Sequence, residues 1–90
     1  MTEKQSPEQK QHYSEGELNK IVLYNDDINT FDFVIEMLMR YCDHNLYQAE
    51  QCAMLTHHKG KSIVKKGAYE ELEPVASALL DKGLSVEIES

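Results

Sequence analysis

The stretch VLYNDDINTFDFV, residues 22–34, changes its character three times along its length. Residues 21–24 form an apolar, β-favouring run that predicts a strand. The polar cluster Asn25-Asp26-Asp27 that follows is typical of a turn. Asn29 is predicted to cap the next helix, with Asp32 at the capping-box position three residues later. The stretch therefore predicts an acidic loop between a strand and a helix, which suits a ligand that is both cationic and apolar.

Two helices are predicted after this loop from apolar residues at helical spacing. The first covers residues 30–42, with an apolar stripe at Phe31, Val34, Ile35, Leu38, Met39 and Cys42. The second covers residues 46–58, starts with a capping box of Asn45 and Gln48 and ends at Gly60. Its buried side is expected to consist of Leu46, Ala49, Cys52, Ala53 and Thr56.

The rest of the chain predicts a third helix and two more strands. The helix covers residues 69–82, with inward positions at Leu72, Val75, Ala76, Leu79 and Leu80. Pro74 fits this helix if its regular part begins near Glu73. Strands are expected at residues 18–24, 61–65 and 84–88. The order β-α-α-β-α-β predicts a small α+β sandwich, a three-stranded antiparallel sheet with the helices packed on one face.

Composition divides the chain into two parts. Residues 1–17 contain no Ile, Val, Leu or Phe and many polar residues. Such a segment buries too little apolar surface to offset the entropy lost on ordering, so it is predicted to be a disordered N-terminal extension. Residues 18–90 are predicted to form one small core domain.

Charge and patterning exclude several classes of function. A net charge of −7 argues against a nucleic-acid partner, whose phosphates require a basic face. No apolar run is long enough for a membrane span or a signal peptide, so a cytoplasmic location is expected. Cys42 and Cys52 fall on predicted helices, lack activating partners and require no oxidising compartment.

Catalytic and metal chemistry are both disfavoured. Asp26 and Asp27 are adjacent in sequence, so their side chains are expected to diverge rather than share a proton. The residues that a metal ion could use lack any metal-binding spacing: Cys42, His44, Cys52, His57 and His58. We therefore expect no enzyme activity, no metal and no cofactor.

Two segments, VLYNDDINTFDFVIEML and QAEQCAMLTHHKGKSIV, resemble the ClpS family of adaptor proteins. The family signature is a strand that ends in Asn-Asp-Asp, a turn into a helix, and a downstream His-x-x-Gly-Lys. The chain has Asn25-Asp26-Asp27 and then His57-His58-Lys59-Gly60-Lys61. The resemblance covers roughly residues 18–88 and includes the order of elements, so it implies a ClpS-like fold.

The resemblance also implies a function and a site. ClpS-like proteins capture proteins whose N-terminal residue is bulky and hydrophobic, and deliver them to a Clp AAA+ unfoldase of the ClpA or ClpC type. In this chain Asn25, Asp26 and His57 would contact the free α-amino group, with Asp27 and Asn29 close by. Binding is then expected to weaken as pH falls below about 6, where histidine side chains become protonated.

Further residues are implied by the same resemblance. The pocket for the first side chain would be lined by Phe31, Ala53, Thr56 and Leu84. Glu70 would face the unfoldase, and the protein would be a monomer. Burial of a Leu or Phe side chain contributes about 1.5–3 kcal/mol, so about micromolar binding is expected.

The chain departs from the family pattern at several positions. Asn29-Thr30 stands where Thr-Pro is frequent, Phe31 where a methionine gate is common, and Thr56 where an apolar residue is usual. The third helix is several residues shorter than in many relatives. Two alternatives stay open: an interaction domain like the C-terminal domain of the ribosomal stalk protein, which shares the layout without N-degron binding, and a small metal-binding or thiol enzyme.

Overall fold

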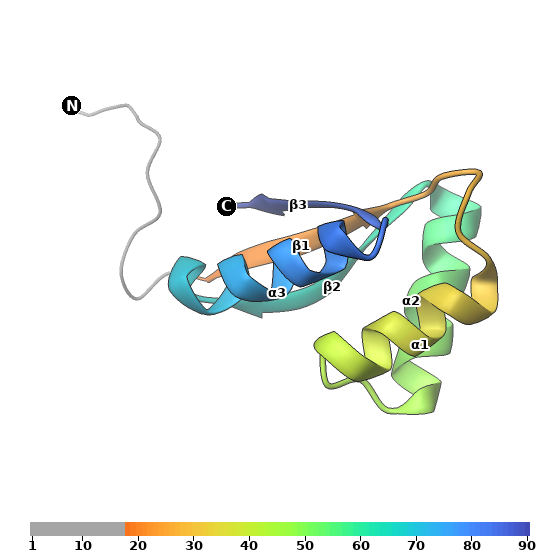
Figure 1. Ribbon diagram of the computed structural model, residues 1–90, viewed down its shortest axis with the longest axis horizontal. Coiled ribbons are helices and arrows are strands. Elements are labelled where there is room, and N and C mark those ends of the chain that lie inside the picture. The colour runs from red at the N-terminus through yellow and green to blue at the C-terminus, as the bar shows by residue number, and fades with distance from the viewer. Residues whose placement is uncertain (1–17) are drawn as a thin grey trace.

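The computed structural model describes residues 18–90, so the predicted extension of residues 1–17 lies outside the described residues. The elements follow in this order: β1 (Asn19–Tyr24), α1 (Phe31–Tyr41), α2 (Leu46–Lys59), β2 (Lys61–Gly67), α3 (Tyr69–Asp81) and β3 (Ser85–Glu89). The predicted order β-α-α-β-α-β is confirmed. Figure 1 shows α3 lying along the sheet, while α1 and α2 pack together toward one end of it.

The three strands form one antiparallel sheet in the order β2-β1-β3. The most apolar strand, β1, is therefore central. Its last residue, Tyr24, pairs with Lys61 of β2 on one side and with Ser85 of β3 on the other. A register shift between Ile21 and Val22 bends the pairing with β2. The C-terminal end of β1 and the N-terminal ends of β2 and β3 therefore meet beside the loop that follows Tyr24.

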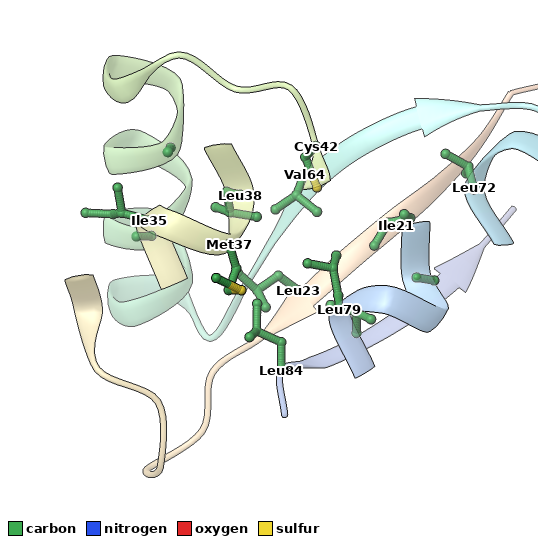
Figure 2. Close-up of a cluster of buried hydrophobic side chains, with 14 residues drawn as sticks. Ile21, Leu23, Ile35, Met37, Leu38, Cys42, Val64, Leu72, Leu79 and Leu84 are labelled. Atoms are coloured by element: carbon green, nitrogen blue, oxygen red, sulfur yellow. The ribbon is translucent and has the colours of Figure 1, made fainter. Parts of the chain in front are cut away.

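The helices cover one face of this sheet, as predicted. Successive residues of a strand point to opposite faces, so Ile21 and Leu23 of β1, two positions apart, share a face. Both belong to a single buried cluster with residues of all three helices (Figure 2). The largest fully buried side chains of this cluster are Ile21, Leu23, Leu38, Leu72 and Leu79.

The predicted helix ends are correct for α2 and wrong for α1. Asn45 and Gln48 form the expected capping box, and Gly60 ends α2 in the left-handed region at φ 93°. The N-cap of α1 is Thr30 instead of Asn29, because the Thr30 hydroxyl accepts a hydrogen bond from the Phe33 N–H at 3.1 Å. The Asn29 side chain is engaged elsewhere, as described below.

Four residues of the predicted apolar stripes are exposed. Phe31, Met39, Leu46 and Leu80 are 43%, 41%, 53% and 54% exposed, whereas Met37 is buried. The apolar stripes were drawn too wide, and packing selects only the residues that face the sheet. In α3 the regular helix begins at Tyr69, so Pro74 lies inside it.

The predicted start of this helix at Tyr69 is confirmed, whereas the prediction that its regular part begins near Glu73, which would accommodate Pro74, is wrong. A proline at this place removes one backbone donor and disfavours the preceding turn. Leu72 and Leu79, which are fully buried on either side of Pro74, hold α3 against the core. Burial of this face outweighs the local preference of the sequence for a later start.

Candidate functional site

The loop between β1 and α1 lies against the C-terminal end of α2. The Asn25 N–H donates to the Gly60 carbonyl oxygen at 2.9 Å. Because Gly60 adopts a left-handed conformation, α2 stops there and the chain turns directly into β2, whose Lys61 pairs with Tyr24. This turn places His57, in the last turn of α2, beside the loop.

Asp26 organises the loop. Its Oδ1 accepts hydrogen bonds from the backbone N–H groups of Ile28, at 3.0 Å, and Asn29, at 2.9 Å. Its Oδ2 accepts from Asn29 Nδ2 at 2.9 Å and from the Ser85 hydroxyl at 3.1 Å. A carboxylate has about four acceptor positions. Those of Asp26 are therefore occupied by groups of the protein itself.

These hydrogen bonds favour the charged form of Asp26. Burial raises the pKa of this carboxyl, but the donors of Asn29, Ile28 and Ser85 lower it by more, so the net pKa lies below the ordinary value. Asp26 thus keeps a fixed negative charge in the loop.

The same loop is tied to the start of β3. The Asn29 side-chain amide donates to the Gly83 carbonyl oxygen at 2.9 Å as well as to Asp26. This contact joins two residues that are 54 positions apart in sequence, and the bond from Ser85 to Asp26 joins two that are 59 positions apart. Leu84, between Gly83 and Ser85, is buried at 3% exposure.

A cavity of about 370 Å³ opens between the end of β1, the loop, α1, α2 and Leu84 in the turn before β3, and this size is typical of a small-ligand pocket. The structure brings together around it all nine residues that the sequence assigned to amine binding or to the apolar pocket: Asn25, Asp26, Asp27, Asn29, Phe31, Ala53, Thr56, His57 and Leu84. Glu70 lies apart from the cavity, exposed in the first turn of α3.

Three lining residues were not predicted: Leu23, Tyr24 and Val34. A signal existed for Val34, which follows Phe31 at the i+3 spacing of one helix face. Leu23 belongs to both the core and the cavity wall. The Tyr24 hydroxyl donates to the Glu89 carboxylate, which raises the pKa of this tyrosine to about 12, so the hydroxyl is engaged outside the cavity.

The cavity has a polar end and an apolar end. Asn25, Asp27 and His57 are exposed at the polar end. Within the described residues, the Asp27 carboxylate has no hydrogen-bond or ion-pair partner, in contrast to Asp26. The apolar end is formed by Leu23, Ala53 and Leu84, which are buried, and by Phe31 and Val34 of α1.

Thr56 is compatible with the apolar end although it carries a hydroxyl. Thr56 is 5% exposed, and its Oγ1 lies 2.7 Å from the Ser62 Oγ. The Ser62 hydroxyl donates to the Cys52 carbonyl oxygen at 3.2 Å, so Ser62 accepts from Thr56. The Thr56 hydroxyl is therefore satisfied within the protein and adds no unpaired polar group to the cavity wall.

The cysteines and histidines of residues 18–90 do not assemble into a metal site. Residues 18–90 contain no group of three or more His, Cys, Asp or Glu side chains placed to hold a metal ion. Burial raises the pKa of the Cys42 thiol to about 11, and burial also raises that of Cys52, which disfavours the reactive thiolate in both. Among the described helices, none is both long and apolar enough to cross a membrane.

Comparison with known proteins identifies the family. The sequence model of the family described as "ATP-dependent Clp protease adaptor protein ClpS" matches residues 14–87. The chain belongs to the ClpS family. ClpS is a family of adaptor proteins and not of enzymes. The family match also replaces the alternative of a domain like that of the ribosomal stalk protein.

Individual ClpS relatives match over part of their length. The ATP-dependent Clp protease adapter protein ClpS of Campylobacter jejuni is 46% identical over 50 residues, which cover 56% of this chain and 52% of the relative. ClpS of Shewanella denitrificans is 46% identical over 44 residues, 49% of this chain and 43% of the relative. The chain thus spans about half the length of the curated relatives it matches.

A solved ClpS structure shares the fold. Agrobacterium tumefaciens ClpS2 bound to L-phenylalaninamide superposes with a TM-score of 0.68, covering 80% of this chain and 94% of that chain. The two sequences are 20% identical. The similarity confirms the ClpS-like α+β architecture that the sequence predicted.

Proposed function

We propose that this ClpS-family chain binds the free N-terminal residue of proteins that begin with Leu, Phe, Tyr or Trp, and delivers them to a Clp AAA+ unfoldase. The observation that carries the proposal is that acidic and acceptor side chains and apolar side chains line one and the same cavity. A free N-terminal residue has the matching shape, because its ammonium group and its side chain leave the same carbon atom.

The polar end suits an α-ammonium group, which has three N–H donors and a positive charge. Asn25, Asp27 and His57 supply acceptors from two elements around the cavity. His57 can accept a hydrogen bond through a ring nitrogen that carries no proton. An acetylated or internal residue lacks the charge and leaves these acceptors unpaired.

The two aspartates of the loop have different roles in this proposal. The oxygens of Asp26 already accept four hydrogen bonds, so Asp26 contributes its charge and the shape of the loop. The exposed Asp27 carboxylate is the one that can accept from the ammonium group without giving up a bond. This assignment refines the sequence-based expectation, which placed the direct contact on Asp26.

The apolar end suits a bulky hydrophobic side chain. Burial of Leu or Phe contributes about 1.5–3 kcal/mol, and each hydrogen bond to a charged group contributes about 1.5–3 kcal/mol. After the cost of association, about micromolar affinity is expected. The structure of A. tumefaciens ClpS2 with L-phenylalaninamide supports this mode, because that ligand combines a free amine with an aromatic side chain.

Delivery completes the proposed function. The family name links ClpS to the Clp protease, and the unfoldase partner would be of the ClpA or ClpC type. Glu70, exposed on α3, would belong to the surface that faces it. The protein would act as a cytoplasmic monomer and use no cofactor.

Binding of labelled peptides tests the proposal. Fluorescence anisotropy should show about micromolar affinity for peptides that begin with Leu, Phe, Tyr or Trp, and none for an N-acetylated Phe peptide or one that begins with Arg. His57→Ala should weaken binding, whereas the neighbouring His58→Ala, which does not line the cavity, serves as the matched control. Equal and feeble binding of all peptides would refute the proposal.

A further inference from the structure

We infer that Asn29 and Ser85 act as positioning residues that hold the amine-binding loop at a fixed distance from the Leu84 wall of the pocket. This inference rests on the proposed function and adds to it a reason for the choice among first residues. The three hydrogen bonds concerned, called the clasp here, are Asn29 to Asp26, Asn29 to Gly83 and Ser85 to Asp26.

The clasp is the side-chain connection between the two ends of the cavity. The Asn29 side-chain amide donates one hydrogen bond to Asp26 Oδ2, at 2.9 Å, and another to the Gly83 carbonyl oxygen, at 2.9 Å. Ser85 reaches back to the same Asp26 oxygen at 3.1 Å. The loop is thereby attached to the chain immediately before and immediately after Leu84.

Leu84 is the residue whose position this attachment determines. It lines the cavity and is buried in the core cluster that also contains Leu23 (Figure 2). The core fixes Leu84 from one side, and the clasp fixes the acceptors of the loop relative to it. The N-terminal residue of a bound protein must place its ammonium group at the loop acceptors and its side chain against Leu84 at the same time. The distance between the acceptors and Leu84 therefore favours side chains of a matching length.

The residues that form the clasp make it resistant to displacement. Gly83 adopts a left-handed conformation at φ 93°, which turns the chain from α3 into β3 next to the loop. The acceptor Asp26 is charged, and hydrogen bonds to charged groups are stronger than those between neutral groups. The clasp therefore resists displacement when a ligand enters the cavity.

The first test measures discrimination rather than affinity alone. Affinities of peptides beginning with Phe, Leu, Ile and Val are measured for the unmodified protein, Asn29→Ala and Ser85→Ala. We expect the ratio between the best and the poorest of these peptides to fall by about tenfold in each variant, within the range of coupling between contacting residues. Ser85→Thr, which keeps the hydroxyl, should retain the ratio.

Two matched controls separate positioning from general stability. Ser77→Ala removes a hydroxyl that donates to the Glu73 carboxylate at 3.3 Å on α3, away from the cavity. Asn45→Ala removes an amide that caps α2. Both controls should leave the ratio unchanged. A ratio that is also unchanged in Asn29→Ala and Ser85→Ala, with binding intact, would overturn the clasp.

A second measurement does not depend on peptide binding. The titration of the Asp26 carboxyl, followed by NMR, should shift to higher pH in both clasp variants, and the methyl signals of Leu84 should move. If the unmodified protein binds no peptide but these signals respond, the proposed function fails and the clasp stands as a structural contact without a selective role. If they do not respond, the clasp itself is refuted.

Discussion

The hydrophobic core and the loop of residues 25–30 are adjacent but are held together by different forces. The core is built from side chains that are almost completely removed from water, among them Leu38 and Leu79. The loop is partly exposed. Its Asp26 carboxylate accepts from the backbone N–H groups of Ile28 and Asn29, and its Thr30 hydroxyl accepts from the Phe33 N–H of α1. Burial is non-directional, whereas a hydrogen bond needs one donor at one place.

This difference determines how each region responds to substitution. A core tolerates changes that conserve volume, since several apolar side chains can fill the same space. The loop depends on individual atoms, because replacement of one acceptor leaves backbone donors unpaired. We therefore expect core substitutions to change stability and loop substitutions to change binding.

The largest effect is expected in the core. Leu79→Ala should lower the free energy of unfolding by about 2–5 kcal/mol, because it removes buried methyl groups and leaves a cavity. Urea unfolding followed by circular dichroism measures the loss, and peptide affinity of the folded fraction should remain unchanged. Leu79→Met, which nearly conserves volume, should cost less than about 1.5 kcal/mol. A loss of affinity in the folded fraction would break the distinction between the two regions.

The second-largest effect is expected for substitutions of the two adjacent aspartates, Asp26 and Asp27. Asp27→Asn should weaken peptide binding by about 1.5–3 kcal/mol, roughly 10- to 150-fold, with stability unchanged. Asp26→Asn should lower both the peptide affinity and the free energy of unfolding, because an amide nitrogen would face the donors of Asn29 and Ser85. Anisotropy and urea unfolding of both variants make the comparison. Equal binding losses without any stability difference would show that both aspartates contact the amine.

A smaller effect is expected at the helix caps. Thr30→Ala and Asn45→Ala should each lower the free energy of unfolding by about 1 kcal/mol, because each removes an N-cap acceptor. Only Thr30→Ala, at the end of the loop, should also weaken peptide binding. Comparable binding losses in both variants would mean that helix stability, and not the shape of the loop, controls the cavity.

The smallest effect is expected from pH. The pKa of Asp26 is lowered in the folded protein, so its charged form stabilises the fold above the ordinary aspartate pKa of about 3.9. That contribution is lost as pH falls through the lower, folded-state pKa. Urea unfolding between pH 6 and 3 should show a steeper loss for the unmodified protein than for Asp26→Asn. Solvent screening of this partly exposed group keeps the difference small.

Much of the fold was predictable because its signals are local. The capping box of Asn45 and Gln48 and the stop at Gly60 depend on residues within one helical turn, and the structure confirms both. The burial of Met37 and the exposure of Leu46 and Leu80 were not predictable. Periodicity gives the angular position of a residue on a helix but does not say how far the neighbouring element extends.

The candidate site divides in the same way. The sequence by itself determined the set of residues, because Asn25-Asp26-Asp27, the following helix and His57 carry a recognisable pattern, and all nine predicted lining residues surround one cavity. Only the tertiary structure distinguishes the surroundings of the residues within that set. Asp26 and Asp27 are neighbours with the same side chain, yet Ile28 and Asn29 of the loop and Ser85 at the start of β3 bind the Asp26 carboxylate, whereas that of Asp27 stays exposed. The contact with Ser85 joins residues 59 positions apart in sequence. Such contacts depend on where the chain returns in space, which no local pattern encodes.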